Sequence, residues 1–117
     1  MPNEKHIEQE IQSKGLNAPR LTPDLIDSVI VDKYFFTAAD GFCGSVNYSA
    51  NHHDSLKLLT FCVLILKNGF TVTGESACAS PENFDRIIGQ KIAYENARNK
   101  IWQLEGYLLK ENLYQDK

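Results

Sequence analysis

The run from Leu56 to Lys67 constrains the fold of this chain more than any other segment. Successive residues of an extended strand point to opposite faces of a sheet, and in this run both faces are almost entirely apolar. We therefore expect a central strand that needs a cover on both faces. The two sets of side chains are Leu59, Phe61, Val63 and Ile65 on one face, and Leu58, Thr60, Cys62, Leu64 and Leu66 on the other.

The residues after this run predict a hairpin. Asn68-Gly69 is typical of a two-residue type I′ turn, because both positions of that turn need a positive φ. Phe70 to Cys78 then alternates between apolar and polar residues, as a return strand does. Gly74 inside it indicates a bulge or a close approach of another backbone. Val31 to Thr37 is aromatic and β-branched and predicts a further strand.

A long helix is predicted after the hairpin. Ser80 would cap it and Pro81 would take its first position, where the missing N–H costs nothing. The helix should run to about Leu113, and a kink or break at Gly106 is left open. Residues at helical spacing predict its core face. They are Tyr94, Ala97, Ile101, Leu104 and Leu108.

Shorter elements precede the sheet. Asn3 to Lys14 predicts a helix with one apolar pair, and Thr22-Pro23 begins a second short helix. Residues 38–54 (Ala38 to Asp54), rich in Gly, Ser, Asn and His, predict a variable surface loop. The expected fold class is α+β: a small antiparallel sheet, its central hairpin turned at Asn68-Gly69, packed on a long C-terminal helix, with short N-terminal helices. Residues 1–117 should form a single domain, in which residues 1–20 are the N-terminal helix and connector.

One helix covers only one face of a sheet. The second apolar face therefore predicts a homo-oligomer, a dimer or a higher state, in which another copy provides the cover. The alternative is a monomer whose N-terminal helices fold across the sheet, which small domains also achieve.

The composition narrows the class of protein. With 43% hydrophobic and 23% charged residues among 117, the chain is ordinary globular material. A net charge of -3 and a pI near 5.5 argue against nucleic acid as a partner. The apolar runs are far shorter than the ~20 residues that cross a bilayer, so no membrane partner is expected. The N-terminus lacks the apolar core of a signal peptide, which predicts a cytoplasmic protein with reduced cysteines.

Neither a metal site nor an active site is predicted. Cys43, His52, His53 and Asp54 match no standard zinc spacing, and a polar loop is the better interpretation. No nucleophile elbow, Walker loop or Rossmann glycine pattern is present. We therefore expect a protein without a metal or cofactor, and not an enzyme.

A mixed stripe on the long helix is the strongest candidate for a site. Lys91, Glu95 and Arg98 lie at steps of three or four, between aromatic residues at both ends. Such a ladder is usually solvated and held by intrahelical ion pairs. It also suits a nucleotide-like ligand, because helix N–H groups and cations bind phosphate and aromatic rings stack on bases. On that second interpretation, the ligand-binding residues are Asn83, Phe84, Lys91, Glu95, Asn96, Arg98 and Trp102.

A family resemblance rests on five segments of the chain. They are residues 16–27, 59–78 (LTFCVLILKNGFTVTGESAC), 80–85 (SPENFD), 92–97 (IAYENA) and 101–109 (IWQLEGYLL). These segments resemble a family of small tailed-phage and prophage proteins of the gene-49/gene-66 type, named by gene position. The resemblance implies a phage accessory protein in the cytoplasm of the infected bacterial host, without an assigned activity. In architecture alone, the chain is similar to the phage sponges that bind cyclic ADP-ribose signals of the Thoeris defence, although none of their ligand-binding residues aligns with it.

Two functions of different kinds follow from the stripe and the resemblance. The first is a phage-encoded, non-enzymatic anti-defence protein that sequesters a nucleotide-type immune signal resembling cyclic ADP-ribose. The alternative is an accessory protein that inhibits or adapts a host enzyme by protein–protein contact, through its acidic surface and its long loop. A role on nucleic acid is disfavoured by the acidic balance of charge.

Overall fold

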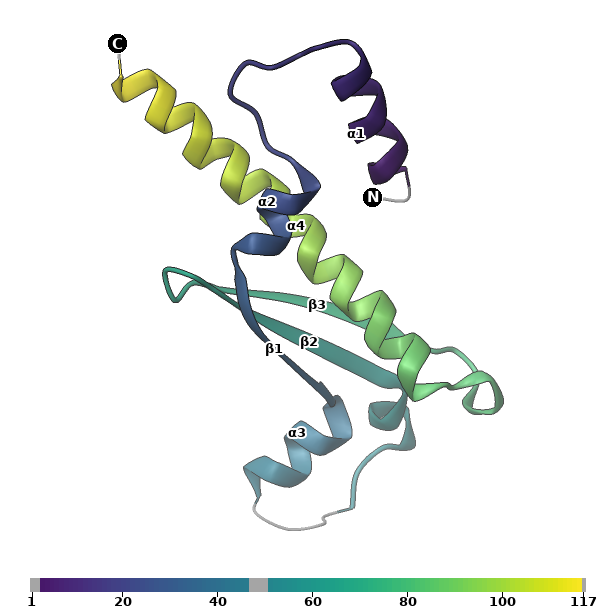
Figure 1. Ribbon diagram of the computed structural model, residues 1–117. Helices are drawn as coiled ribbons and strands as arrows, with labels where there is room; N and C mark the ends of the chain where they lie inside the picture. Colours follow the sequence, from purple (N-terminus) through teal and green to yellow (C-terminus); the bar gives the residue numbers. More distant parts are fainter. Residues whose placement is uncertain (1–2, 47–50, 117) are drawn as a thin grey trace.

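The computed structural model describes residues 3–46 and 51–116. Figure 1 shows a small sheet with the long helix α4 along one face and the helix α3 at one end. The predicted α+β fold, with an antiparallel sheet on a long C-terminal helix and short N-terminal helices, is confirmed. The elements are α1 (Glu4–Ser13), α2 (Pro23–Ser28), β1 (Ile30–Thr37), α3 (Ala38–Ser45), the 3-10 turn η1 (Asp54–Leu58), β2 (Leu59–Leu66), β3 (Thr71–Ala77), the 3-10 turn η2 (Pro81–Asn83) and α4 (Arg86–Gln115).

The apolar run lies at the centre of the sheet, as predicted. The strand order is β1-β2-β3, and both pairs are antiparallel. The strand itself begins at Leu59, because the three residues before it close the turn η1. Its alternating residues differ in exposure, since one set is buried under α4 and the other is only half-buried. The buried set is Thr60, Cys62, Leu64 and Leu66.

The hairpin is confirmed, but its turn lies one residue earlier than predicted. The amide of Gly69 donates to the carbonyl of Leu66 at 2.8 Å, which places Lys67 and Asn68 at the centre of the turn. Gly69 follows with φ at 89°, the left-handed conformation that glycine adopts without strain. The amide of Phe70 donates to Asn68 Oδ1 at 2.9 Å and closes the loop. A three-residue loop that ends in a left-handed glycine is the second common way to close a hairpin.

The predicted close approach at Gly74 is confirmed, and it fixes how α4 sits on the sheet. A Cβ at this position would overlap the backbone nitrogen of Ala97 and the backbone oxygen of Ala93. Both alanines are fully buried. The two backbones can therefore approach only because no side chain larger than a methyl group lies between them.

The long helix begins five residues later than predicted. Ser80 caps nothing with its side chain, and Pro81–Asn83 form a separate 3-10 turn. Asp85 takes the cap instead, and its Oδ1 accepts from the amide of Ile88 at 3.0 Å. Aspartate caps as well as serine, so the two sites could not be ranked from the sequence. The helix then continues unbroken through Gly106, because one glycine costs a long helix only about 1 kcal/mol.

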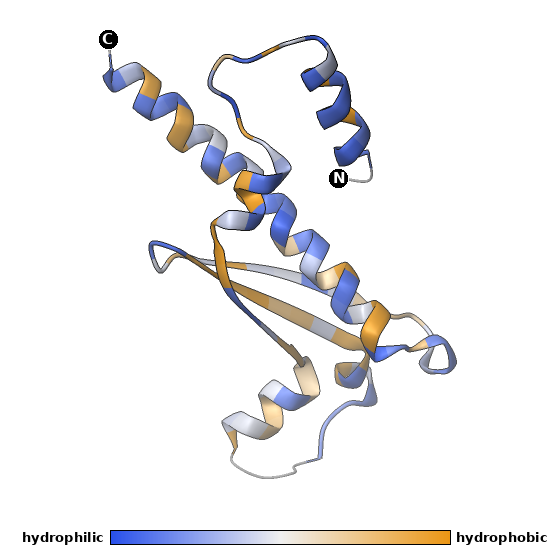
Figure 2. Cartoon of the chain, in the orientation of Figure 1, coloured by the Kyte–Doolittle hydropathy of each residue, from blue (hydrophilic) through white to orange (hydrophobic). Residues whose placement is uncertain are grey.

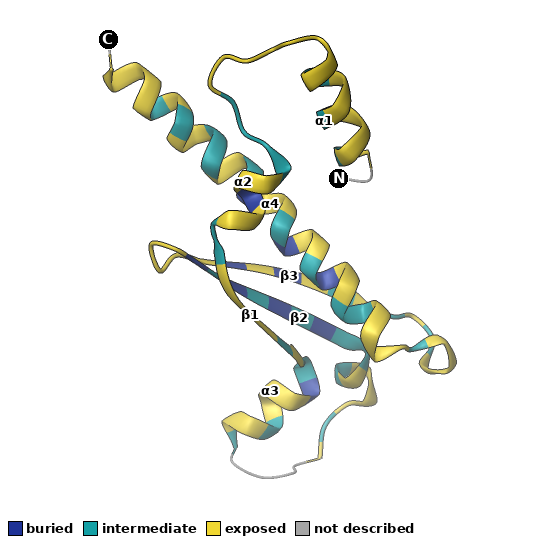
Figure 3. Ribbon diagram, in the orientation of Figure 1, coloured by how far each residue is buried: buried dark blue, intermediate teal, exposed yellow. Residues whose placement is uncertain are grey.

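The predicted core face of α4 is right for its first half and wrong for its second. Ala97 and Ile101 are fully buried, and Tyr94 packs against the core. Leu104 and Leu108 are instead 39% and 48% exposed. The helix diverges from the sheet toward its C-terminus, so its second half is less covered than its first (Figures 1 and 3).

The predicted surface loop 38–54 is wrong in its first half. Residues Ala38–Ser45 form α3, which begins with a capping box. The Asp40 amide donates to Thr37 Oγ1, and the Thr37 amide donates to Asp40 Oδ2. Glycine and serine within the segment concealed the helix, because both have low helix propensity. Residues 51–53 are irregular, and the part of the prediction on residues 47–50 lies outside the described residues.

The two N-terminal helices do not cover the second face of the sheet. The chain leaves α1 at Gly15, whose φ of 65° stops the helix as predicted, and Thr22 caps α2 by accepting from the Leu25 amide. Ile26 of α2 is fully buried beside α4. None of the described residues of α1 is buried, and its surface is almost wholly polar (Figure 2). The monomer arrangement with these helices across the sheet is therefore not what the structure shows.

Candidate functional site

Two clefts, each of about 560 Å³, are lined by the first half of α4. Both fall in the size range of small-molecule sites. We call them the α3–α4 cleft and the Arg98 cleft. The α3–α4 cleft is lined by Phe35, Phe36, Thr37, Ala39, Asp40, Cys43, His52, Lys57, Thr60, Phe84, Arg86 and Gln90. The Arg98 cleft is lined by Glu4, Lys5, His6, Asp27, Lys91, Tyr94, Glu95, Arg98 and Asn99.

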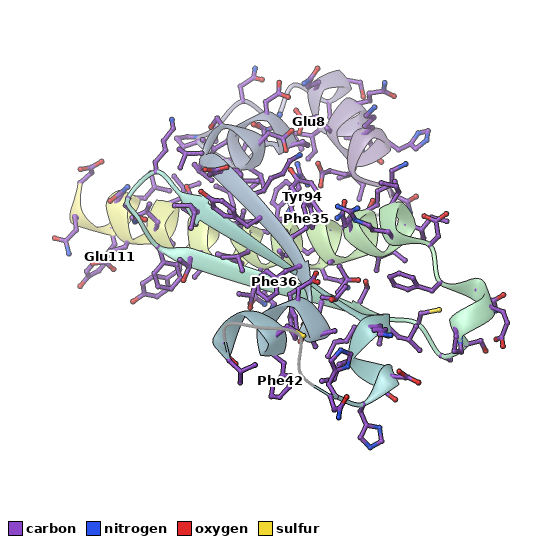
Figure 4. All side chains as sticks on the ribbon, turned by 90° about the horizontal axis from the view of Figure 1, so that it is seen from below. Glu8, Phe35, Phe36, Phe42, Tyr94 and Glu111 are labelled. Carbon is purple, nitrogen blue, oxygen red and sulfur yellow. The ribbon has the colours of Figure 1, made fainter. Side chains whose placement is uncertain are left out.

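The α3–α4 cleft lies where β1 ends, β2 begins and α4 starts. Asp85 caps α4, and this cap places Phe84 directly before the helix and Arg86 in its first turn. Phe36 comes from the end of β1, beside α3 (Figure 4). Lys57 comes from η1 on the other side. Three stretches that are distant in the sequence, 35–43, 52–60 and 84–90, thus supply its walls.

The side chains of this cleft suit an anion that carries a flat ring. Arg86 and Lys57 are its cations, and Phe36 and Phe84 are exposed enough to line it. Asp40 is its one carboxylate among the described residues, and the amide of Thr37 donates to it in the capping box. Lys57 lies 3.8 Å from the exposed Asp54, a contact that solvent screens strongly. Among the described residues that line the cleft, the two cations thus outnumber the one carboxylate.

The Arg98 cleft is organised around an ion-pair cluster. The Arg98 guanidinium donates to Glu4 at 2.7 Å and 2.9 Å and to Asp27 Oδ1 at 2.8 Å. It also donates to the carbonyl of Pro23 at 3.2 Å. Only 12% of its side chain is exposed. The hydrogen bonds to Glu4 raise the pKa of Arg98, and the one to Asp27 adds to the rise. This arginine links α1, α2 and α4 and has little capacity left for a ligand.

The structure separates the seven residues that the sequence predicted as one site. Lys91, Glu95 and Arg98 share the Arg98 cleft, whereas Phe84 lines the other cleft and Asn83 is exposed in η2. The predicted ion pairs within the ladder are not among those that the described residues form. The ligand-binding role of the seven stays a prediction.

The two remaining predicted residues have structural neighbours. Asn96 Nδ2 donates to the carbonyl of Glu75 at 2.8 Å and ties α4 to β3. Trp102 packs against the buried core, and its Nε1 meets no acceptor among the residues that the structure describes. Neither side chain lines either cleft.

Sequence reasoning missed most of the α3–α4 cleft. Arg86 was not predicted as a site residue, because a helix that starts at Ser80 has Arg86 beyond its first turn. Phe36 was assigned to a strand without a site, and Lys57 was assigned to the strand itself. The spacing Thr37-x-x-Asp40 is a signal for this cleft in the sequence, since it marks a helix start within residues 38–54.

Two further features, a metal-ion cluster and a membrane-spanning helix, are not found among the described residues. Within residues 3–46 and 51–116, no three His, Cys, Asp or Glu side chains come together in a way that would hold a metal ion. The helices of the same residues lack the combination of length and hydropathy that a bilayer span requires.

The fold and the clefts define a small α+β protein with a single long helix as its scaffold. The model of one family, the phage protein (N4 Gp49/phage Sf6 gene 66) family, matches residues 21–113. The chain therefore belongs to this family of bacteriophage proteins, as the sequence resemblance had indicated. The matched region begins after α1 and contains both the sheet and α4. No curated protein and no solved structure matched the chain.

Proposed function

We propose that this phage protein acts in the cytoplasm of the infected host as a non-enzymatic anti-defence protein, by sequestering a nucleotide-type immune signal such as cyclic ADP-ribose in the α3–α4 cleft. The observation that carries the proposal is the combination of Phe36, Phe84, Arg86 and Lys57 around one cleft of about 560 Å³. A volume of this size accommodates a ligand of nucleotide dimensions.

Each part of such a ligand has a fitting group in the cleft. The guanidinium of Arg86 forms bidentate hydrogen bonds that suit a phosphate, and the ammonium of Lys57 adds a second positive charge. The ring of Phe84 or Phe36 offers a flat surface on which a base stacks. The amide of Gln90 supplies the donor and acceptor that base edges and ribose hydroxyls require.

The comparison of the two clefts supports this choice over the Arg98 cleft. Glu4, Asp27 and Glu95 bring three carboxylates to the Arg98 cleft, and its buried arginine is already paired with two of them. An anionic ligand there would have to displace a carboxylate from Arg98. In the α3–α4 cleft, no described carboxylate forms an ion pair with Arg86.

Binding is tested by thermal shift and calorimetry with cyclic ADP-ribose isomers and cyclic dinucleotides. A ligand at 100 times its dissociation constant should stabilise the protein by about 2.7 kcal/mol. Arg86→Gln should weaken the binding by about tenfold or more, because it removes a charge-assisted hydrogen bond. Lys91→Gln is the matched control, since it removes a cation from the Arg98 cleft instead.

The outcomes separate the alternatives. Weaker binding in Lys91→Gln with unchanged binding in Arg86→Gln would move the site to the Arg98 cleft and to the stripe predicted from the sequence. No stabilisation by any of these nucleotides would remove the proposal. Mass spectrometry of the ligand after incubation tests the non-enzymatic part, which predicts that the ligand is recovered unchanged.

Contact with a host enzyme is a second candidate function, favoured by the exposed end of α4. Tyr107 is 76% exposed and Leu108 is 48% exposed where the helix has left the sheet. Tyrosine is one of the residues that most often anchor protein interfaces, and the leucine beside it adds apolar surface. A single stoichiometric host partner that binds without nucleotide, and that Leu108→Glu no longer binds, would favour this function.

A further inference from the structure

We propose that the face of the sheet opposite α4 binds a second copy of this chain, which then lies beside the α3–α4 cleft. We call this surface the open face. Two large aromatic residues of this face, both on the edge strand β1, are uncovered, since Tyr34 is 53% exposed and Phe36 is 38% exposed. The open face consists of Asp32, Tyr34 and Phe36 of β1, Leu59, Phe61, Val63 and Ile65 of β2, and Thr71, Thr73 and Glu75 of β3.

The strand register arranges the open face in rows. Tyr34, Val63 and Thr73 lie side by side across the three strands and form the central row. The rows on either side of it are built from the same kinds of residue, with an aliphatic or aromatic side chain on β2. Phe36 and Phe61 form a tilted ring pair with their centroids 5.7 Å apart. A surface with an apolar middle and a polar rim is the usual composition of an interface core.

The charges of the open face fit another copy and exclude anionic partners. Its two carboxylates, Asp32 and Glu75, lie on opposite edges and in different rows. A two-fold axis that runs parallel to the central row, between the sheets of the two copies, would place each carboxylate opposite a neutral residue: Asp32 opposite Phe36, and Glu75 opposite Thr71. No Lys or Arg is among the described residues of this face, so nucleic acid and acidic lipid lack a cation to bind.

The size of the face predicts a modest affinity. A strand of eight residues spans about 26 Å and three strands span about 14 Å, which gives a patch of several hundred Å² per copy. Standard interfaces bury about 800 Å² per partner, so a dimer through this face belongs to the weaker class. We expect a dissociation constant in the micromolar range.

The open face is continuous with the α3–α4 cleft through Phe36, which belongs to both. A second copy on the face would cover this ring and border one wall of the cleft. This coupling rests on the proposed function, whereas the dimer itself follows from the open face alone.

Sedimentation equilibrium without any nucleotide tests the dimer, over about 5 to 200 µM. The average mass should rise with concentration from the 13.2 kDa of one chain toward twice that value. Tyr34→Glu and Thr73→Arg each place a charge in the central row and should keep the protein monomeric. Ile88→Glu is the matched control, because Ile88 is 56% exposed on α4 and should leave the dimer intact.

Three results would overturn the proposal. They are a monomer over the whole range, a dimer that persists in both central-row variants, or a dimer that Ile88→Glu disrupts equally. Circular dichroism checks that each variant is folded. If one of the two central-row variants is unfolded, the other one alone tests the dimer. If the wild-type protein is monomeric, the open face would be free to bind a protein of another sequence. Nucleotide binding is scored separately with Arg86→Gln, which should dimerise normally even if no nucleotide binds.

Discussion

The sheet with α4 and the N-terminal region with α1 are held by different forces. The sheet packs on α4 through fully buried apolar side chains such as Leu64 and Ile101, around the backbone contact at Gly74. The N-terminal helix α1 contributes no buried residue among those described, and two arginines hold it. Arg20 donates to Glu8 at 2.7 Å, and Arg98 donates to Glu4 at the same distance.

This difference predicts an order of stability. Burial of apolar surface contributes about 25 cal/mol per Å². Ion pairs recover only part of what their desolvation costs. Regions with few buried apolar contacts open locally before the whole molecule unfolds. We therefore expect α1 to detach while the sheet and α4 remain folded.

The largest effect should come from Gly74→Ala. Its new Cβ would overlap backbone atoms of Ala93 and Ala97, which cannot move aside as a flexible side chain can. We expect a loss of about 4 kcal/mol in the free energy of unfolding, or no folding at all. Urea denaturation measures it. Gly44→Ala is the control, since no atom lies within 4 Å of its new Cβ, and it should be neutral or stabilising. Equal losses in both variants would contradict the close packing of β3 on α4.

Ile101→Ala should come next, at about 3 kcal/mol, because it leaves a cavity in the core. Leu108→Ala, two turns later on the same helix, should cost well under 1 kcal/mol because its side chain is half exposed. The pair of variants tests whether α4 leaves the sheet where the structure places it. Similar losses in urea denaturation would mean that Leu108 is covered in solution.

Arg98→Met should act mainly on the N-terminal region. It leaves Glu4, a largely buried carboxylate, without its guanidinium, which costs about 2 kcal/mol. Hydrogen exchange should show a loss of protection in α1 and α2 with β2 still protected. Lys91→Met on the same helix, where the side chain is exposed, should leave the exchange of α1 unchanged. Loss of protection across the whole sheet would contradict the separation of the two regions.

The smallest effect should come from Glu8. The hydrogen bond from Arg20 lowers the pKa of Glu8 from 4.5 to about 2. Its stabilising contribution is therefore complete above pH 4.5 and is lost as the pH falls through about 2. The thermal stability of Glu8→Gln should fall slightly below that of the wild type at pH 6, and the two should converge near pH 2. Glu10→Gln is the control, because its pair with Lys14 is an exposed contact of 3.1 Å.

The parts of the fold that were predicted correctly rest on local rules. A run that is apolar on both faces marked β2, aromatic and β-branched residues marked β1, and alternation marked β3. Gly15 and Thr22 marked helix ends that the structure confirms. The errors arose where two local solutions are nearly equal in energy. Ser80 and Asp85 are both good caps, and the turn at Asn68-Gly69 closes with two or with three residues. Glycines in α3 hid a helix that tertiary contacts stabilise.

The candidate site was harder to predict than the fold. Of the seven residues chosen from the helical stripe, only Phe84 lines the α3–α4 cleft. The spacing predicts Arg98 either as a partner of Glu95 or as a donor to a ligand. In the structure it instead pairs with Glu4 and Asp27, which are far away in the sequence. Helical spacing shows which residues share a face of α4, and it cannot show what packs against that face.

The sequence by itself determined the class of fold, the central apolar strand and the family, because periodicity and local motifs are written in neighbouring residues. The tertiary structure alone decided where α4 leaves the sheet, which arginine stays available for a ligand and which apolar face stays uncovered. The physical reason is that burial and ion pairing depend on distances in space between residues that are remote in the chain, as between Arg98 and Glu4.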